Sequence, residues 1–471
     1  MKLTNLEGSS ILIFGLGLEG LSTLDFIRRV FPDKPIGLAD EKSLDQLDIE
    51  VREIISSYAN VRLHLGNDQL GTLSEYDVII KSPGIPPDVP ILRRAIDIGK
   101  RITSLTAIFF ANCPGKIVGI TGTKGKSTTT SLIYGILQAG SLDTYLVGNI
   151  GIPPLTYLER AKQDTIFVYE LSSHQLEGLQ QSPHIAVLLN IVPEHLDYYR
   201  SFERYVQAKK NITRYQSYQD YLVYNAVFPI PRQIADETKA HRFPFSLEEP
   251  IIPGCFVSGS DIVCCLEGRE CEKIVGKDES LLLGRFNLHN VLAAVAVGKL
   301  LGVAIEKIAL AIRSFQPLQH RLELVGTYRG ITFYDASIST VPEATIEHLN
   351  TLGDDVQTLL LGGQDRYLDF SNLAKRLLTT KVKTLILFPA TGQRIYEALH
   401  AQQTASSAVP QCFFVQNMEE AVRIAFSYTD SGKICLLSPA SPSFGLFKDY
   451  KERGTLFKRY VRQIGKIEES L

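Results

Sequence analysis

Short apolar runs alternate with stretches of helical character along nearly the whole chain. The runs are rich in Val, Ile and Leu, and glycine, proline or a polar turn bounds each one. Such runs are typical of parallel strands that are buried on both faces of a sheet. They predict strands at residues 11–14, 78–80, 117–120, 167–170, 186–190, 358–361, 384–388 and 434–437. The fold class that this pattern predicts is α/β, built from several open sheets.

The length of the chain indicates more than one domain. Its 471 residues exceed the roughly 250–300 residues that one hydrophobic core supports. We expect one boundary near Leu105, ahead of a Cys-Pro-Gly turn, and a second near Pro317, where a helical stretch ends. The predicted domains are residues 1–105, 106–317 and 318–471. Residues 228–276 lack a clear helical period, so we expect an irregular β excursion inside the middle domain.

Charge and cysteine usage exclude several classes of protein. The 49 basic and 51 acidic residues give a net charge of −2, which predicts no binding of nucleic acid or of an anionic membrane. The apolar stretch at residues 11–18 is too short to span a bilayer and lacks a cleavage site, so no targeting or transmembrane segment is expected. The seven cysteines show no metal-binding spacing, which favours reduced thiols in a cytoplasmic protein.

A glycine-rich loop is the strongest local signal. Residues 119–128 read Gly-Ile-Thr-Gly-Thr-Lys-Gly-Lys-Ser-Thr and lie between a predicted strand and a helical stretch. In this setting backbone N–H groups and the helix N-terminus can hold phosphate, while Lys126 reaches the β- and γ-phosphates and Ser127 binds Mg²⁺. The strict phosphate-loop pattern requires glycine where this chain has Ile120, and Gly122 stands nearby instead. The loop predicts nucleotide binding without choosing between a kinase, an ATPase and a ligase.

A second glycine motif follows the first predicted strand. Residues 15–20 read Gly-Leu-Gly-Leu-Glu-Gly, and Asp40 ends the next strand about twenty residues later, as in dinucleotide-binding turns. The turn could hold a nicotinamide dinucleotide, hold another nucleotide diphosphate such as a UDP-sugar, or be purely structural. We favour the nucleotide diphosphate, because the phosphate loop already supplies a triphosphate site. A hydride-transfer enzyme remains the alternative from a different class.

Five motifs taken in order resemble the Mur ligase family. They are Thr121–Thr128, Gly148-Asn-Ile-Gly151, Glu170-Leu-Ser-Ser-His-Gln175, Asn190-Ile-Val-Pro-Glu-His-Leu-Asp197 and Gln319-His-Arg321. Four more features resemble the MurD-type, glutamate-adding branch: the residue 15–20 turn, Ser82-Pro-Gly-Ile85, Leu437-Ser-Pro-Ala440, and Phe447-Lys448 with Arg453-Gly454. The likeness extends from about residue 9 to residue 460.

This resemblance implies an ATP-dependent ligase of peptidoglycan synthesis. It implies a Rossmann-like N-terminal domain for the UDP part of UDP-N-acetylmuramoyl-L-alanine, a central P-loop ATPase-type α/β domain for ATP, and a Rossmann-like C-terminal domain for glutamate. The substrate carboxylate would become an acyl phosphate, which the glutamate amine then converts to an amide. One or two Mg²⁺ ions would assist, D-glutamate is the default substrate, and a monomer is expected. Because the substrates bind on separate domains, closure should precede catalysis.

The resemblance also assigns the site residues. The catalytic set is Lys126, Glu170, His195 and Lys209, and the metal set is Ser127, Glu170, His195 and a carbamylated Lys209. ATP would contact Gly122, Thr123, Lys124, Gly125, Lys126, Ser127, Thr128, Asn287, Asn290, Arg321 and Asp335. The UDP substrate would contact Gly15, Gly17, Leu18, Glu19, Gly20, Asp40, Ser82, Pro83, Gly84, Asn149 and Ser172. Spacing alone does not separate Lys209 from its neighbour Lys210, and Phe286 stands where the family commonly has histidine.

The glutamate-binding region departs from the family pattern. The resemblance places glutamate on Ser337, Ser339, Arg366, Ser443 and Tyr450. Ser337 replaces an expected lysine and Arg366 replaces another, and Lys and Arg do not hold a carboxylate in the same way. The departures resemble a MurD variant that adds L-glutamate, which stays open as an alternative. A folylpolyglutamate synthetase and a non-catalytic nucleotide sensor are more remote alternatives, and the N-terminal glycine turn argues against the synthetase.

Overall fold

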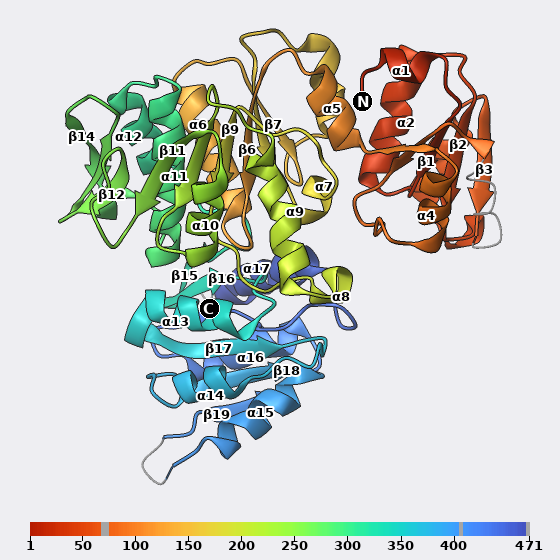
Figure 1. Ribbon diagram of the computed structural model, residues 1–471. Coiled ribbons are helices and arrows are strands. Elements are labelled where there is room, and N and C mark those ends of the chain that lie inside the picture. The colour runs from red at the N-terminus through yellow and green to blue at the C-terminus, as the bar shows by residue number, and fades with distance from the viewer. Residues whose placement is uncertain (67–74, 405–407, 468–471) are drawn as a thin grey trace. The chain divides into compact units, whose positions relative to one another are not determined.

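The computed structural model of the protein describes residues 1–66, 75–404 and 408–467. Three β-sheets with helices packed against them confirm the predicted α/β class (Figure 1). The chain divides into two compact units: Met1–Ser280 with Leu288–Ser314, and Leu281–Asn287 with Phe315–Leu471. The domain boundaries expected near residues 105 and 317 remain predictions.

The first sheet has five parallel strands in the order β3-β2-β1-β4-β5. The strands are β1 (Ile11–Phe14), β2 (Ile36–Asp40), β3 (Val61–Leu65), β4 (Val78–Lys81) and β5 (Arg101–Thr103). The helices around it are α1 (Thr4–Glu7), α2 (Leu18–Val30), α3 (Ile49–Ser56), α4 (Pro90–Asp97) and α5 (Leu105–Asn112). All four residues of the central strand β1 are buried, as its continuous apolar run predicts.

The second sheet has nine strands in the order β14-β13-β12-β11-β10-β9-β6-β8-β7. Its strands are β6 (Lys116–Thr121), β7 (Thr144–Gly148), β8 (Ile166–Glu170), β9 (Ile185–Leu188), β10 (Tyr221–Asn225), β11 (His241–Ser246), β12 (Gly254–Ser258), β13 (Asp261–Cys265) and β14 (Cys271–Gly276). The pairings from β7 to β12 are parallel, and those of β12–β13 and β13–β14 are antiparallel.

The helices of the central region are α6 (Lys126–Ala139), α7 (Ser173–Leu176), α8 (Leu196–Tyr199), α9 (Phe202–Arg214), α10 (Pro229–Glu237), α11 (Arg285–Leu300) and α12 (Ile305–Ser314). The expectation that residues 228–276 form only a β excursion was wrong at its start, where α10 lies. Helix α10 has prolines in its first turn, a position where a helix tolerates them. Only Pro231, Ile234 and Ala235 of this helix are buried, so its helical pattern of apolar residues is weak in the sequence.

The prediction of reduced thiols was also wrong for one pair of cysteines. Cys265 and Cys271 are joined by a disulfide. They face each other across the antiparallel strands β13 and β14, which places their side chains within bonding reach. Spacing along the sequence does not reveal this juxtaposition, because it depends on the register of the hairpin.

The third sheet has six strands in the order β15-β16-β20-β17-β18-β19, and β15 alone of these runs antiparallel to its neighbour. The strands are β15 (Glu323–Tyr328), β16 (Ile331–Asp335), β17 (Val356–Gly362), β18 (Thr384–Phe388), β19 (Gln411–Phe414) and β20 (Ile434–Leu437). The helices are α13 (Pro342–Leu352), α14 (Ser371–Leu377), α15 (Thr391–Ala401), α16 (Met418–Tyr428) and α17 (Tyr450–Ile467). All eight predicted strands occur among the three sheets.

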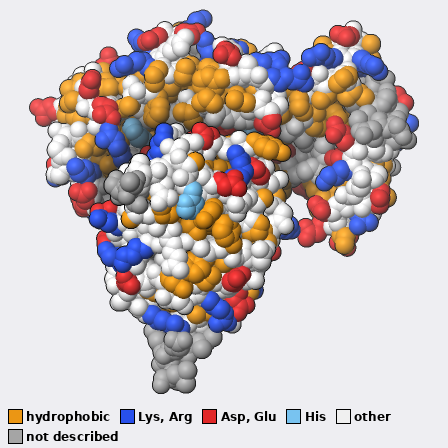
Figure 2. Space-filling model, turned by 90° about the horizontal axis from the view of Figure 1, so that it is seen from below, with side chains coloured by type: hydrophobic (Ala, Val, Ile, Leu, Met, Phe, Trp, Pro, Cys, Tyr) orange, Lys and Arg blue, Asp and Glu red, His pale blue; other side chains and the backbone are white. Residues whose placement is uncertain are grey.

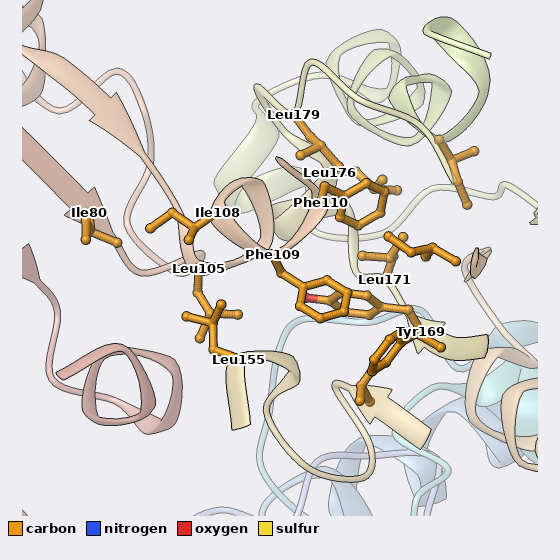
Figure 3. Close-up of a cluster of buried hydrophobic side chains, with 14 of the residues drawn as sticks. Ile80, Leu105, Ile108, Phe109, Phe110, Leu155, Tyr169, Leu171, Leu176 and Leu179 are labelled. Atoms are coloured by element: carbon orange, nitrogen blue, oxygen red, sulfur yellow. The ribbon is translucent and has the colours of Figure 1, made fainter. Parts of the chain in front are cut away.

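A continuous apolar core fills the first unit from the N-terminal sheet to the central sheet (Figure 3). Helix α5 supplies its middle, and the Phe109 ring meets the rings of Phe167 and Tyr169 edge to face, with centroids 5.0 and 5.8 Å apart. Each fully buried side chain of this size contributes about 1.5–3 kcal/mol. This packing holds the first two sheets in one compact unit.

The surface agrees with the balanced charge of the sequence. On the face shown in Figure 2, Lys and Arg side chains are interspersed with Asp and Glu side chains. Within the described parts of the chain, no helix has the length and apolar character that a bilayer crossing requires.

Candidate functional site

The phosphate loop connects β6 to α6 and depends on glycine at position 125. Gly125 has a φ of 88°, a conformation that residues with a Cβ rarely adopt. A Cβ at this position would also lie 2.4 Å from Asn290 Oδ1. That same oxygen accepts a hydrogen bond from Thr129 Oγ1 at 3.1 Å. Asn290, which is predicted to contact ATP, is therefore packed directly against the loop.

Asn190 holds the loop from the neighbouring strand. Its carbonyl accepts the Thr123 N–H at 2.7 Å, its Oδ1 accepts the Lys124 N–H at 2.9 Å, and its Nδ2 donates to the Lys124 carbonyl at 2.9 Å. Asn190 follows β9, which pairs with β6, so adjacent strands set this geometry. Asn190 was not among the predicted site residues, although a polar residue at the end of the apolar run 186–190 was a usable signal.

The first turn of α6 presents the residues expected at the phosphates. Lys126 Nζ donates to the carbonyls of Gly122 and Thr123, both at 3.0 Å, so its charge lies at the loop. Ser127 and Thr128 are buried in the same turn. Lys124 forms an ion pair with Glu194 at 2.8 Å. Backbone N–H groups at this helix end provide partial positive charge, which suits a phosphate ligand.

Glu170 ends β8, the strand that pairs with β6 on the other side, and stands opposite Ile120. Its side chain is 4% exposed, and among the described residues its Oε2 has no hydrogen-bond partner. Burying an unpartnered carboxylate oxygen is costly. A cation beside Glu170 would remove this cost, so the residue fits a metal ligand.

Lys209 lies on α9 and is 1% exposed. Its Nζ donates to the Gly122 carbonyl at 2.9 Å and to Thr121 Oγ1 at 3.2 Å. Burial, and then the charge of Lys126, hold the pKa of Lys209 well below its usual range. Its neighbour Lys210 forms an ion pair with Glu237 instead. The structure therefore brings Lys209, rather than Lys210, to the phosphate loop.

His195 precedes α8 in a left-handed conformation with a φ of 55°. Its ring centroid lies 5.0 Å from that of His174 and 6.3 Å from that of Tyr205. Burial lowers the pKa of His195, and burial together with His195 lowers the pKa of His174 to about 4. Both imidazoles are therefore neutral at pH 7. His174 was not among the site residues predicted from the sequence.

The donor set near the loop fits Mg²⁺. Ser127 offers a hydroxyl, Glu170 an unpartnered carboxylate oxygen, and His195 a neutral ring nitrogen. Hard divalent cations prefer oxygen ligands and often retain water. A carbamate on Lys209 would add a further oxygen ligand where an amine now lies.

The N-terminal glycine turn is closely packed. Gly15 has a φ of 94°, and a Cβ on Gly20 would lie 2.0 Å from the Gly15 carbonyl oxygen. Ser82 Oγ donates to that same oxygen at 2.8 Å. The carboxylate of Asp40 accepts the Leu16 N–H at 2.8 Å. Asp40 thus orders the turn itself, whereas the sequence suggested only that it faces a ribose.

The other residues predicted to contact the UDP substrate lie in several parts of the first unit. Gly17 and Leu18 are exposed at the start of α2, and the loop after β4 carries the partly accessible Pro83 and Gly84. Ser172 caps α7. Asn149 is exposed after β7, and its N–H donates to the Glu170 carbonyl at 3.2 Å. Glu19 belongs to the turn itself, but its carboxylate is directed inward, and one of its oxygens is buried.

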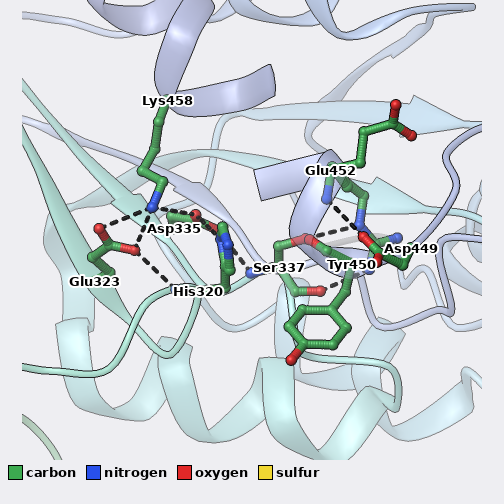
Figure 4. Close-up of polar contacts among 9 residues, drawn as sticks. His320, Glu323, Asp335, Ser337, Asp449, Tyr450, Glu452 and Lys458 are labelled. Atoms are coloured by element: carbon green, nitrogen blue, oxygen red, sulfur yellow. Dashed lines mark hydrogen bonds and ion pairs between the residues drawn. The ribbon is translucent and has the colours of Figure 1, made fainter. Parts of the chain in front are cut away.

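The second unit contains a charged cluster around the predicted ATP-contacting residue Asp335 (Figure 4). His320 Nδ1 lies 2.7 Å from Asp335 Oδ2, and the His320 N–H donates to Glu323 Oε2 at 2.8 Å. Lys458 Nζ lies 2.8 Å from Glu323 and 3.9 Å from Asp335. His320, Glu323 and Asp335 have the spacing of a cation site, and the ammonium group of Lys458 already lies beside both carboxylates. Sequence reasoning had missed the role of Lys458.

Arg453 organises the predicted glutamate-binding region. It is fully buried and donates to the Ser337 and Ser441 carbonyls at 2.7 and 3.0 Å. Ser337 Oγ donates to the Tyr450 carbonyl at 2.8 Å. The sequence had placed Arg453 in a motif without a function.

The remaining predicted residues of the second unit are dispersed. Ser339 and Ser443 are buried, whereas Arg366 is exposed after β17. Asn287 Nδ2 donates to the Leu283 carbonyl at 2.7 Å. Arg321 follows His320, and its N–H donates to the Leu318 carbonyl at 3.1 Å.

The chain belongs to the Mur ligase family. Residues 9–104 match the MurD-like N-terminal domain of Mur ligases, residues 120–298 match the Mur ligase middle domain, and residues 320–441 match the Mur ligase glutamate ligase domain. Two curated relatives cover nearly its full length, and each is called UDP-N-acetylmuramoylalanine–D-glutamate ligase. The one from Acetivibrio thermocellus is 34% identical over 98% of this chain and 97% of its own. The one from Koribacter versatilis is 33% identical over 99% of this chain and all of its own.

Solved structures confirm the fold. The UDP-N-acetylmuramate–alanine ligase MurC from Thermotoga maritima has a TM-score of 0.61 and 17% identity, covering 98% of this chain and all of its own. The ADP complex of MurF ligase from the same organism has a TM-score of 0.57 and 16% identity, with 98% of each chain covered. A type C pseudomurein peptide ligase from Methanothermus fervidus has a TM-score of 0.58 and 18% identity, covering 98% of this chain and all of its own.

Proposed function

We propose that this chain is an ATP-dependent ligase that joins glutamate to UDP-N-acetylmuramoyl-L-alanine through an amide bond. The placement of the buried Glu170 and Lys209 at the phosphate loop carries the proposal. Relatives with the corresponding name match the chain over nearly its whole length, and they favour D-glutamate as the amino acid. The reaction consumes cytoplasmic substrates and belongs in the cytoplasm.

The chemical difficulty is that a carboxylate must attack the γ-phosphorus of ATP while both groups are negative. Positive charge fixed at the meeting point lowers this barrier. Lys126 supplies such a charge and exchanges its contacts with the Gly122 and Thr123 carbonyls for contacts with the β- and γ-phosphates. Backbone N–H groups at the start of α6 hold the phosphates in place.

Mg²⁺, when bound by Ser127, Glu170, His195 and a carbamylated Lys209, neutralises phosphate charge. The depressed pKa of Lys209 favours the neutral amine, which is the form that adds to CO2. The product is a carbamate and one proton, and it converts a basic side chain into an oxygen ligand. Burial against the loop thus prepares Lys209 for this modification.

The second half-reaction begins once the acyl phosphate has formed. The neutral glutamate amine attacks the acyl carbon, and the same cations stabilise the oxyanion that forms. The bond to phosphate then breaks, phosphate leaves, and the nitrogen releases one proton to solvent. Glutamate is held by the second unit, where Arg366 offers a planar cation and Ser339, Ser443 and Tyr450 offer hydroxyl groups. Ser337 contributes indirectly, because Arg453 and the Tyr450 carbonyl already engage it.

The test is to incubate the purified protein with ATP, Mg²⁺, UDP-N-acetylmuramoyl-L-alanine and either enantiomer of glutamate. The expected result is ADP and phosphate together with a UDP product whose mass has grown by one glutamyl residue, formed with D-glutamate. Product formed with L-glutamate alone would favour the alternative substrate, which the replacement of a lysine by Ser337 suggests. ATP hydrolysis without any lengthened product would contradict the ligase proposal.

A further inference from the structure

A partly buried hydrogen bond joins the N-terminal glycine turn to helix α7 of the central region. Gln175 Nε2 donates to Glu19 Oε1 at 2.6 Å. Glu19 lies in the first turn of α2, directly after the exposed Gly17 and Leu18, and Gln175 lies on α7. The other carboxylate oxygen of Glu19 is buried without a hydrogen-bond partner, so Gln175 is the hydrogen-bonding contact of this carboxylate in the described structure.

Gln175 also forms hydrogen bonds with the segment that begins at Glu170. Its Oε1 accepts the N–H of Ser172 at 2.9 Å and the hydroxyl of Ser172 at 3.1 Å. The Gln175 N–H in turn donates to Ser172 Oγ at 3.2 Å, which completes a capping box at the start of α7. Ser172 is two residues beyond Glu170, the proposed metal ligand at the end of β8. A continuous chain of hydrogen bonds therefore connects Glu19 to this segment.

Gln175 and the residues that flank its capping box in sequence are buried. Gln175 is 3% exposed, and Leu171 and Leu176, which flank the capping box in sequence, are part of the core shown in Figure 3. Lys81 is the cation that faces Glu19 from β4, and its Nζ donates to the Ile85 carbonyl at 2.9 Å. Hydrogen bonds to a charged group are strong in such surroundings.

We propose that Glu19 is a positioning residue that, through Gln175, fixes the glycine turn relative to the Glu170–Gln175 segment, so that a nucleotide-diphosphate substrate bound at the turn presents its carboxyl group to the phosphate loop. This inference rests on the proposed ligase function. The turn and the loop belong to different sheets, and a shift of about 1 Å between them would misalign the reacting atoms. Direct contact between the Glu19 carboxylate and the substrate diphosphate would be repulsive, which agrees with its inward direction.

An exchange of the two side chains tests the inference. In Gln175→Glu two carboxyl groups face each other, and in assays at about pH 8.5, above the pKa of Glu19, their negative charges repel. In the double variant Glu19→Gln with Gln175→Glu, the amide at position 19 donates to the carboxylate at position 175. That carboxylate can still accept from Ser172, because Glu is a usual third residue of a capping box. The exchange restores the bond while reversing its direction.

We expect Gln175→Glu to lower kcat/KM for UDP-N-acetylmuramoyl-L-alanine by about tenfold or more, the effect of losing one charge-assisted hydrogen bond. The KM for ATP should change by less than about twofold, and the double variant should recover kcat/KM to within about threefold of wild type. Glu159→Gln is the matched control, because it removes the exposed Arg29–Glu159 ion pair of 2.7 Å between the same two regions. It should leave all these values unchanged.

The outcomes separate this inference from the proposed function. Wild-type protein that forms no product overturns the ligase proposal. Active wild-type protein overturns only this inference if Gln175→Glu behaves like wild type or if the double variant stays as impaired as the single one. Should Gln175→Glu fail to fold, Glu19→Ala replaces it: a tenfold loss in kcat/KM with an unchanged KM for ATP supports the inference, and wild-type kinetics overturns it.

Discussion

Arg453 contacts Ser337 at two points, because its Nη2 donates to the Ser337 carbonyl at 2.7 Å and its Nε donates to the hydroxyl at 3.1 Å. Both residues are fully buried. Ser337 stands where the resemblance to glutamate-adding Mur ligases leads us to expect a lysine. The serine at position 337, which departs from the family pattern, is thus part of a buried hydrogen-bond network in the second unit.

Replacing Ser337 by that lysine should therefore destabilise the protein. Ser337→Lys would bring a second cation beside the buried guanidinium and displace its contacts, so we expect the free energy of unfolding to fall by more than about 3 kcal/mol. Ser337→Ala, which loses only the hydroxyl contacts, should cost about 1 kcal/mol. Urea unfolding of both variants measures the difference. A lysine variant as stable as wild type would show that Arg453 can move aside.

Lys209 and Lys210 provide a matched pair for testing the metal ligand. Lys209→Ala removes an amine bonded to the phosphate loop, and turnover should fall by at least about a thousandfold. Lys210→Ala removes only the ion pair between Lys210 and Glu237, a glutamate that is half exposed. The turnover of this variant should therefore stay within about twofold of wild type. Phosphate release in the presence of both substrates provides the measurement. Equal losses in the two variants would contradict the assignment.

Lys126→Ala tests the charge at the phosphate loop. We expect turnover to drop by several orders of magnitude, because a principal cation facing the phosphoryl group is lost. Thermal unfolding should confirm that the variant is folded, and the rate of ADP formation gives the result. Near-normal turnover would show that the reacting phosphate binds elsewhere.

Glu19 should make stability depend on pH. Burial raises the pKa of Glu19 to about 7 from an ordinary value of 4.5, while Gln175 and Lys81 lower it by less. Between these two values the folded protein binds more protons than the unfolded chain. The contribution of Glu19 is therefore fully present below pH 4.5 and is lost as the pH rises through 7, by at most about 3 kcal/mol. Urea unfolding between pH 5 and 8 should show wild type losing stability relative to Glu19→Gln; a constant difference would refute the shift.

The two glycines at positions 17 and 20 should differ sharply in their tolerance of a methyl group. Gly20→Ala would force a Cβ to within 2.0 Å of a backbone oxygen, so the turn must open and the unfolding midpoint should fall by several degrees. Gly17 has open space around it and a φ of −74°, so Gly17→Ala should leave the midpoint nearly unchanged. Differential scanning calorimetry of the two variants makes the comparison.

Periodicity and local chemistry made much of this molecule predictable. The buried strands were visible because continuous apolar runs are distinctive, and the phosphate loop was visible because its glycines and Lys126 are adjacent in sequence. Contacts between distant segments were not visible. Nothing in the sequence places Gln175 against Glu19, joins Cys265 to Cys271, or turns Asp40 toward the Leu16 N–H, because each contact depends on how separate elements pack.

The antiparallel strands at one end of the central sheet have a consequence for behaviour at high concentration. Strand β14 is the outermost strand and carries charged side chains: Lys273 pairs with Asp261 at 2.9 Å and Glu272 pairs with Lys299 at 2.5 Å. Such charges oppose the addition of a foreign strand to a sheet edge. A large, mostly parallel sheet, which would otherwise offer a template for aggregation, is thereby protected on this side.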